Sequence, residues 1–237
     1  MTHARLELND LTVRFGGVTA IDGVSLRHDS GGVVGLLGAN GAGKTTFVNV
    51  LSGIVRPAHG RARLDGYELT TLPAHRIARA GLARTFQNLR LFGSLTALEH
   101  LLTPYGARRR GRKAALALLA DVGLTGTGER YPGELSYGEQ RRLELARALA
   151  LEPRVILLDE PLAGLPGSES DEMLDLFSRL RDSGTTLLLV EHDVPSVLRI
   201  SDRVLVLDRG RLLADGPPAA VAADPGVRRA YLGDGDD

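Results

Sequence analysis

A glycine-rich segment near the start of the chain has the residue types and spacing of a phosphate-binding loop. It runs from Gly38 to Thr45 as glycine, four residues, glycine, lysine and threonine. The apolar run Val33–Leu37 before it indicates a buried strand, and a helix is expected after it, from residue 44 to about residue 52. This order suits phosphates, because glycines let the turn expose backbone N–H groups and a helix start carries partial positive charge.

Lys44 and Thr45 supply the chemistry of this loop. A lysine at this place reaches the β and γ oxygens of a triphosphate, and the threonine hydroxyl ligates Mg²⁺. An ordinary glycine-rich turn is the alternative, but strand, loop and helix signals occur here in the required order. We therefore predict a nucleotide site with Mg²⁺ as cofactor, built from Gly38, Asn40, Gly41, Ala42, Gly43, Lys44, Thr45 and Thr46.

Two adjacent carboxylates follow a second apolar run. Asp159 and Glu160 come directly after residues 155–158, Val-Ile-Leu-Leu, which read as a buried strand. Ligands of open parallel sheets bind at the carboxyl ends of the strands, so this pair is expected beside the phosphate loop. Asp159 is the candidate Mg²⁺ ligand and Glu160 the candidate base for an attacking water. An acidic pair that merely ends a strand is the alternative.

The segment Leu135–Glu139, Leu-Ser-Tyr-Gly-Glu, predicts the start of another helix. Ser136 and Glu139 have the spacing of a capping box, in which each side chain bonds the other residue's backbone N–H. The helix start is a second anion site, formed by Ser136, Gly138 and Glu139. Because the chain already has one complete phosphate loop, this second site suggests contact with a neighbouring subunit's nucleotide; a simple helix cap remains the alternative.

Composition limits the classes of partner. The 237 residues carry 29 Lys and Arg against 29 Asp and Glu, so no overall charge draws the chain to nucleic acid or anionic lipid. The sequence has no cysteine, which excludes disulfides and thiolate metal sites and fits a reducing compartment. Its apolar runs fall far short of the roughly 20 residues that cross a bilayer. We expect membrane attachment, if any, to come through another protein.

The order of hydrophobic patterns predicts one α/β domain over residues 1–237. Residues 1–88 are β-rich, with a turn or bulge expected at Asn9-Asp10, and residues 89–146 are helical. Residues 147–237 return to strands and helices with βαβ spacing, which implies a parallel sheet. Helices are expected over 95–102, 114–122, 140–151 and 168–181, and strands over 24–27, 61–64, 185–190, 204–207 and 212–213.

One run of charge lies within the helical part. Residues 108–113, Arg-Arg-Arg-Gly-Arg-Lys, hold five basic side chains in six positions. A solvated loop between helices is the expected role, and contact with anionic lipid or an acidic partner is the alternative.

Taken in order, these motifs resemble the ATPase subunit of ABC transporters. The resemblance covers essentially the whole chain and implies a P-loop NTPase fold, with a RecA-like mixed-sheet core, an N-terminal antiparallel β subdomain and an inserted helical subdomain. It also implies roles for three more residues. Phe15 would stack on adenine, Gln87 would contact nucleotide and Mg²⁺ and couple the site to a transport subunit, and His192 would contact the γ-phosphate as a switch. The catalytic residues would then be Glu160, His192 and Lys44. The guanine-reading pattern Asn-Lys-x-Asp is absent from the sequence, so ATP is preferred over GTP.

A finer likeness is to the ATPases of branched-chain amino acid importers. It rests on Phe15-Gly16-Gly17, Arg84-Thr85-Phe86-Gln87, Leu91-Phe92, Tyr137, Arg141-Arg142-Leu143-Glu144 and Ala230-Tyr231-Leu232-Gly233. Lipopolysaccharide exporters and urea or amide importers share much of this pattern, so they stay as alternatives. Two departures from the family are Pro166, where Asp or Asn is usual, and a short segment between Leu102 and Leu135.

The resemblance implies a head-to-tail pair of ATPase subunits on the cytoplasmic face of the membrane, peripherally attached through permease subunits. A solute-binding protein would act with them indirectly, and no nucleic-acid partner is expected. A DNA- or ribosome-acting ABC ATPase would need coiled-coil arms, tandem cassettes or a basic face. A non-hydrolysing nucleotide sensor would be expected to lack Glu160 or His192, and both are present.

Overall fold

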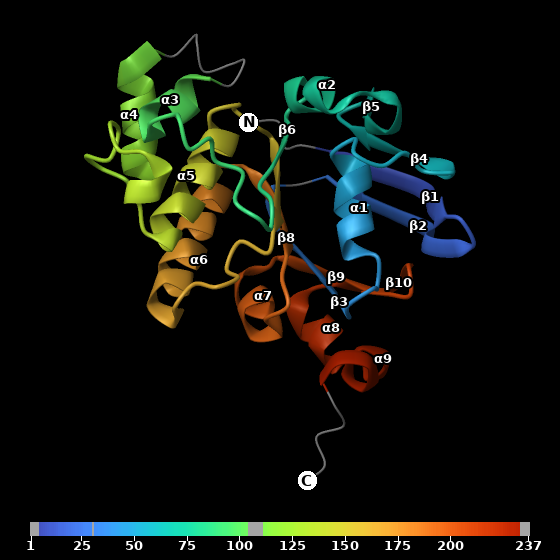
Figure 1. The fold of residues 1–237 in the computed structure, drawn as a ribbon. Coiled ribbons are helices and arrows are strands. Elements are labelled where there is room, and N and C mark those ends of the chain that lie inside the picture. Colours follow the sequence, from blue (N-terminus) through green and yellow to red (C-terminus); the bar gives the residue numbers. More distant parts are fainter. Residues whose placement is uncertain (1–4, 30, 104–110, 233–237) are drawn as a thin grey trace.

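The computed structural model describes residues 5–29, 31–103 and 111–232, and within them the strands form two sheets. The antiparallel sheet has the order β2-β1-β4-β5, and the larger sheet has the order β10-β9-β3-β8-β7-β6. Figure 1 shows the antiparallel sheet on one side of the molecule and a group of helices on the other. The antiparallel strands are β1 (Leu6–Phe15), β2 (Val18–His28), β4 (His59–Leu64) and β5 (Tyr67–Glu68).

The larger sheet is parallel except at one edge. Its strands are β3 (Gly32–Gly38), β6 (Leu82–Arg84), β7 (Val155–Asp159), β8 (Thr186–Val190), β9 (Arg203–Asp208) and β10 (Arg211–Gly216), and only β9 and β10 pair antiparallel. All five residues of β7 and of β8 are buried, as expected when both faces of a parallel sheet are covered.

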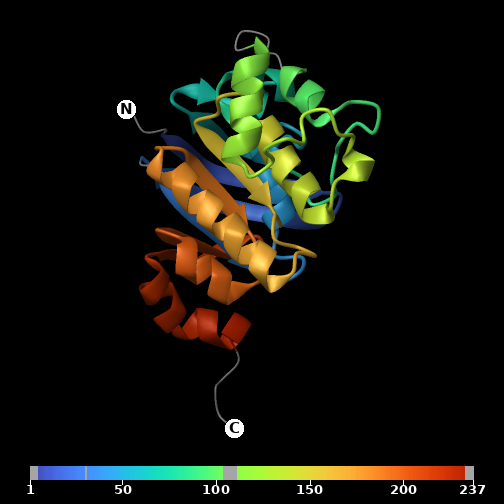
Figure 2. The ribbon, with the colours of Figure 1, turned by 90° about the vertical axis from the view of Figure 1, so that its left-hand side faces the viewer.

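Two hydrophobic cores lie on the two faces of this sheet. Along β3, Val33 and Leu37 enter one core, and Val34 and Leu36 enter the other, because neighbouring side chains of a strand point to opposite faces. Helices α6 (Gly167–Asp182), α7 (Val194–Ile200) and α8 (Pro218–Ala223) contribute to the first core, and α1 (Lys44–Leu51) and the antiparallel sheet contribute to the second. Figure 2 shows α6 and α7 running across the sheet.

The helical part also contributes buried side chains to the first core. It contains α3 (Ala97–Leu102), α4 (Gly111–Asp121) and α5 (Tyr137–Leu149). Thr96 with Glu99 and Ser136 with Glu139 form capping boxes at the starts of α3 and α5, which confirms the capping box predicted at Ser136. Since α5 runs across residue 146, the division of the chain at residues 88/89 and 146/147 stays a proposal.

Several elements differ from the expected ones. β2 is longer than residues 24–27, and α5 includes residues 137–139 ahead of the periodic stretch 140–151, because it starts at the predicted capping box. The short elements β5, β6, α2 (Ala74–Arg79), α7 and α9 (Pro225–Val227) have too few residues for a clear periodic pattern. The interruption expected in β1 is confirmed by its register shifts and by the positive φ of Asp10.

The basic run falls partly outside the described residues, which exclude Arg108, Arg109 and Arg110. Arg112 and Lys113 lie in α4 rather than in a loop, and Arg112 pairs with Glu129. In the part of the chain that the structure describes, no helix combines the length and apolar character needed to cross a membrane.

Gly43 is required by the turn from β3 into α1. Its φ is +107°, and a Cβ there would lie 2.5 Å from the Ala20 carbonyl oxygen. We expect Gly43→Ala to lower the free energy of unfolding by about 1–3 kcal/mol in urea titrations. Gly133→Ala is the matched control, because a Cβ at Gly133 meets nothing within 4 Å, and should stay within about 0.5 kcal/mol. Equal stability of the two variants would contradict this role of Gly43.

Candidate functional site

The phosphate loop is the connection between β3 and α1, and two of its three glycines, Gly38 and Gly43, pack where no side chain fits. A Cβ on Gly38 would lie 2.7 Å from the Leu207 carbonyl oxygen, on the inner side of the loop. A Cβ on Gly41 would meet nothing within 4 Å, so this part of the loop faces open space. The first turn of α1 has no acidic residue, and its N–H groups lack partners within the helix. The loop therefore presents donors and positive potential to an anion.

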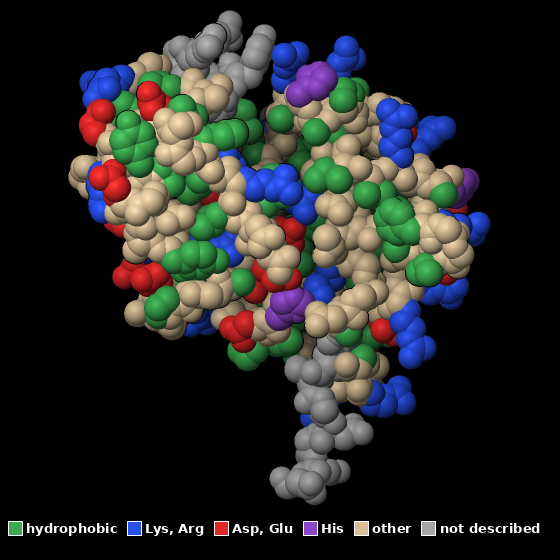
Figure 3. Space-filling view, viewed as in Figure 1, with side chains coloured by type: hydrophobic (Ala, Val, Ile, Leu, Met, Phe, Trp, Pro, Cys, Tyr) green, Lys and Arg blue, Asp and Glu red, His purple; other side chains and the backbone are tan. Residues whose placement is uncertain are grey.

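A cleft of about 180 Å³ opens beside this loop. Figure 3 shows acidic, basic and histidine side chains gathered toward the centre of the face that lies between the helical part and α1. The cleft brings together residues from β2, the phosphate loop, α1 and the ends of β7 and β8, namely Ala20, Ala39, Asn40, Gly41, Gly43, Lys44, Thr45, Thr46, Glu160 and His192.

Lys44 is buried at the bottom of the cleft and folded back on its own loop. Its ammonium donates to the carbonyl oxygens of Gly38 and Ala39, the latter at 3.1 Å. Burial lowers the pKa of Lys44, whereas the carboxylates of Glu160 and Asp159 raise it. The two acids predicted from the sequence thus lie close enough to act electrostatically on the predicted lysine.

Asp159 is held by a residue that the motif analysis did not assign to the site. The Arg84 guanidinium, at the end of β6, donates to Asp159 Oδ2 at 2.7 Å, and both side chains are buried. Its other terminal nitrogen donates to Asn49 Oδ1 on α1 at 2.7 Å and to Ser52 Oγ at the end of that helix at 2.9 Å. Arg84 therefore ties the carboxylate at the end of β7 to the helix that follows the phosphate loop.

Glu160 is held from two sides by the residues that the resemblance singled out. Gln87 Nε2 donates to Glu160 Oε2 at 2.7 Å, and His192 Nε2 lies 2.7 Å from Glu160 Oε1. The backbone of Glu160 has a φ of +50°, which is uncommon for a residue with a side chain. Strained backbone conformations of this kind are found preferentially at functional sites. The carboxylate stands at the edge of the cleft with both oxygens in contact with partners.

Glu191 is a further buried acid that sequence reasoning missed. Its Oε1 accepts from the Leu162 N–H at 2.7 Å, and its Oε2 accepts from the His192 N–H at 3.2 Å. Burial raises the pKa of Glu191, and the two backbone donors oppose that shift. Its position connects the segment after Glu160 to the segment that carries His192.

The remaining predicted residues do not line this cleft. Ser136 Oγ accepts from the Glu139 N–H at 3.2 Å, and Glu139 Oε2 accepts from the Ser136 N–H at 2.7 Å. Gly138 lies against the Glu169 carboxylate, which a Cβ on this glycine would meet at 2.0 Å. Phe15 ends β1 with an exposed ring. One chain therefore does not place the start of α5 in the cleft that holds Lys44.

Comparison with known proteins gives the family of this chain. The family model described as "ABC transporter" matches residues 21–163, and "Branched-chain amino acid ATP-binding cassette transporter" matches residues 211–237. The high-affinity branched-chain amino acid transport ATP-binding protein BraF of Pseudomonas aeruginosa is 44% identical, over 99% of this chain and 100% of its own length.

Two solved cassettes share the fold. The ADP conformation of MJ1267, an ATP-binding cassette of an ABC transporter, is 29% identical, with a TM-score of 0.86 over 99% of this chain and 100% of its own. MJ0796, solved as a dimer in a post-hydrolysis state with ADP and Pi, is 27% identical, with a TM-score of 0.80 over 90% of this chain and 98% of its own. The chain belongs to the ABC transporter family and has the fold of its ATP-binding cassettes.

Proposed function

We propose that this chain is the ATP-hydrolysing subunit of an importer for branched-chain or other hydrophobic amino acids. The observation that carries the hydrolytic part is the position of Glu160 at the edge of the phosphate-loop cleft, in contact with both Gln87 and His192. Likeness to BraF over the full chain, together with the match at residues 211–237, supports the amino-acid part.

The residues of the cleft suit ATP with Mg²⁺. Among the described residues no three His, Cys, Asp or Glu side chains form a metal cluster. This agrees with the usual Mg²⁺ site of such enzymes, where one or two carboxylates act together with phosphate oxygens. Asp159 and Thr45 would hold the ion, with Gln87 next to them. Bound Mg²⁺ would neutralise charge that builds up on the phosphates.

The proposed roles of the other residues follow from their contacts. Lys44 would exchange the carbonyl oxygens of Gly38 and Ala39 for phosphate oxygens, which gain more from a cation. Glu160 would take the proton of the attacking water, and His192 and Gln87 would keep its carboxylate oriented. Phe15, exposed at the end of β1, would stack on adenine.

A head-to-tail dimer would complete each site. Ser136 Oγ accepts its capping bond and so keeps a proton that can be donated to a γ-phosphate. Because Ser136 and Gly138 do not line their own chain's cleft, a second cassette, identical or related, would bring them to the nucleotide. The dimeric state of MJ0796 supports this arrangement.

Partners in the membrane complete the proposal. The segment from Gln87 to Leu95 would pass closure of the dimer to permease subunits, and Phe92 in that segment is 56% exposed. The chain would thus lie peripherally at the cytoplasmic face of the membrane, with a solute-binding protein acting on the other side.

Glu160→Gln tests the proposed base. The amide keeps one acceptor and one donor for Gln87 and His192 but cannot accept the proton, so the ATP turnover rate should fall by roughly 10²–10⁴-fold while ATP binding persists. Turnover by phosphate release and binding by a fluorescent nucleotide would measure the two effects. Near-normal turnover would overturn the assignment of Glu160.

Ser136→Arg tests the second half of the site. The longer cation should block closure of a neighbouring chain onto the start of α5 but spare nucleotide binding by a single chain. ATP-dependent dimerisation of the Glu160→Gln protein, with and without Ser136→Arg, would be followed by light scattering. Ser183→Arg at the exposed far end of α6 is the control and should leave dimerisation unchanged. Unaltered dimerisation by Ser136→Arg would contradict the trans contact.

Partner capture tests the transport part. The tagged chain, pulled from detergent-solubilised membranes of its own organism, should retain permease subunits and a solute-binding protein, and that protein's ligand should be a hydrophobic amino acid. A permease recovered alone would favour export, and a urea- or amide-binding protein would favour those solutes. Recovery of no membrane protein would contradict the transport role.

A further inference from the structure

We propose that Tyr137, Arg141 and Glu144 of α5 position Glu160 of the same chain, by holding the two segments that flank it. The proposal rests on the function of Glu160 proposed above. The three side chains and their backbone partners, Phe86 and Ala163, are called the α5 link below.

The first arm of the α5 link holds the peptide groups of Phe86 on both sides. Glu144 Oε1 accepts from the Phe86 N–H at 3.3 Å, and Arg141 Nη1 donates to the Phe86 carbonyl oxygen at 3.0 Å. Arg141 and Glu144 lie one helical turn apart and thus share a face of α5. The residue after Phe86 is Gln87, whose amide contacts Glu160.

The second arm reaches the turn that follows Glu160. Arg141 donates from Nη2 and Nε to Tyr137 Oη, at 2.7 and 3.1 Å, and Tyr137 Oη donates to the Ala163 carbonyl oxygen at 3.2 Å. Ala163 closes that turn, because its N–H donates to the Glu160 carbonyl oxygen at 3.3 Å. The Arg141 guanidinium therefore connects two segments. One is Phe86, which precedes Gln87, and the other is the turn that follows Glu160.

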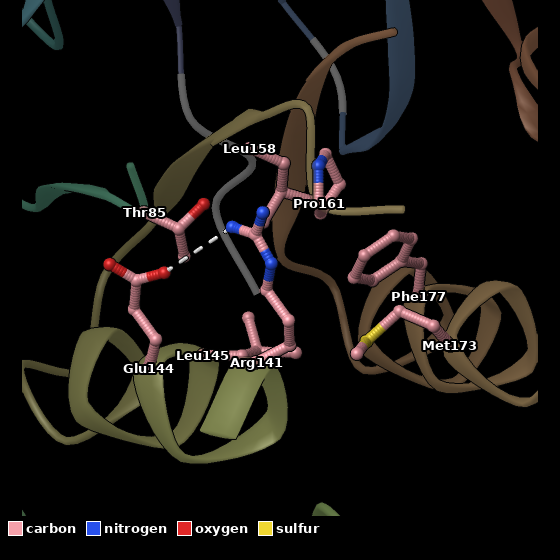
Figure 4. Close-up of a pocket in the computed structure, with 8 residues that line it drawn as sticks. All are labelled: Thr85, Arg141, Glu144, Leu145, Leu158, Pro161, Met173 and Phe177. Atoms are coloured by element: carbon pink, nitrogen blue, oxygen red, sulfur yellow. Dashed lines mark ion pairs between the residues drawn. The ribbon is translucent and has the colours of Figure 1, made fainter. Parts of the chain in front are cut away.

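The Arg141–Glu144 pair of the α5 link is buried and charged, which makes the geometry of its hydrogen bonds specific. Figure 4 shows Arg141 and Glu144 facing one another above α5, with their ion pair drawn as a dashed line. The pair measures 3.9 Å, and the exposed fractions of the two side chains are 4% and 2%. A buried guanidinium that loses one acceptor keeps an unsatisfied donor, so a displaced Phe86 carbonyl is costly, and a displaced Ala163 carbonyl takes the acceptor away from the Tyr137 hydroxyl.

Within the described part of the chain, the Thr85 side chain makes no hydrogen bond that could fix this segment on α5 in place of the Phe86 contacts. Thr85 faces a cavity of about 10 Å³, which Leu158, Pro161, Met173 and Phe177 also line (Figure 4). Its hydroxyl has no hydrogen-bond partner among the described residues. The polar contacts of Phe86 are therefore the side-chain bonds that join residues 85–87 to α5, and further along Arg147 of α5 also donates to the Arg90 carbonyl oxygen.

The α5 link therefore connects the start of α5 to the segments that flank Glu160 within one chain. α5 begins at Ser136, the proposed contact for a neighbouring nucleotide, and the α5 link lies in the first two turns of the same helix. A shift of α5 would move the Phe86 and Ala163 carbonyls together. Glu160 would then keep or lose its orientation according to the position of α5, which makes Arg141 a positioning residue for hydrolysis.

The test compares Arg141→Met and Tyr137→Phe with a neighbouring control in the full-length chain. Arg142→Met removes the same charge from the same helix, but Arg142 bonds Val122 and Glu172 rather than the α5 link. Arg141→Met should lower kcat for ATP by about tenfold or more, since small misplacements of catalytic groups are costly, with little change in KM or nucleotide Kd. Tyr137→Phe should act in the same direction, and Arg142→Met should leave kcat unchanged.

The double variant of Arg141→Met with Gln87→Ala distinguishes a positioning role of Arg141 from a general loss of structure. Because Gln87→Ala already removes the first arm, adding Arg141→Met to Gln87→Ala should lower kcat by a smaller factor than Arg141→Met does in the wild-type chain, since only the arm through Tyr137 and Ala163 remains to be lost, whereas independent effects multiply. Multiplying effects, or an equal loss of kcat in Arg142→Met, would overturn the proposal. A wild-type chain that binds ATP without turnover would instead count against the proposed function.

Amide hydrogen exchange tests the α5 link even if the wild-type chain does not hydrolyse ATP. Without nucleotide, Arg141→Met should speed exchange in the peptide that carries Phe86 and Gln87 and in residues 161–165, because both segments lose their anchor. Arg142→Met should leave both unchanged. Exchange that is the same in Arg141→Met and wild type would overturn the proposal independently of any hydrolysis assay.

Discussion

The structure of the site depends on one constraint, which is that parallel strands end at the same edge of their sheet. β6, β7 and β8 are neighbours in that order, so the residues that follow them meet there although they are far apart in sequence. Gln87 follows β6, Glu160 follows β7 and His192 follows β8. The contacts of the Glu160 carboxylate are therefore a direct result of sheet topology.

Three acidic side chains next to Glu160 and to the residues that contact it are buried, and each is held by a specific partner. Asp159 has Arg84, Glu144 has Arg141 and Arg147, and Glu191 has two backbone N–H groups. Removing charge from water costs several kcal/mol per ion, and partners with good geometry offset that cost. Such a network tolerates few arrangements, so it fixes the positions of the loops that carry Glu160 and His192 more than it adds net stability.

The parts of the site that are local in sequence could be predicted, and the parts that need tertiary contacts could not. The loop from Gly38 to Thr45 and the capping box of Ser136 with Glu139 have their signals within eight residues, and both form. The partners of Arg84, Arg141 and Glu191 lie 75, 55 and 29 residues away, so no local pattern reveals them. The same holds for β6, whose three residues become a strand only beside β7.

The start of α5 is a weak anion site when it is considered alone. Ser136 and Glu139 already satisfy one another's N–H groups, and the Glu169 carboxylate lies against Gly138, so part of the helix-dipole field is offset by negative charge. A free phosphate would therefore bind only weakly at the start of α5. A nucleotide whose charge is already neutralised by Lys44 and Mg²⁺ of another chain would be repelled less, while Ser136 keeps a proton to donate. In the proposed dimer, the start of α5 would therefore bind a nucleotide that is already held by the other chain, rather than phosphate in solution.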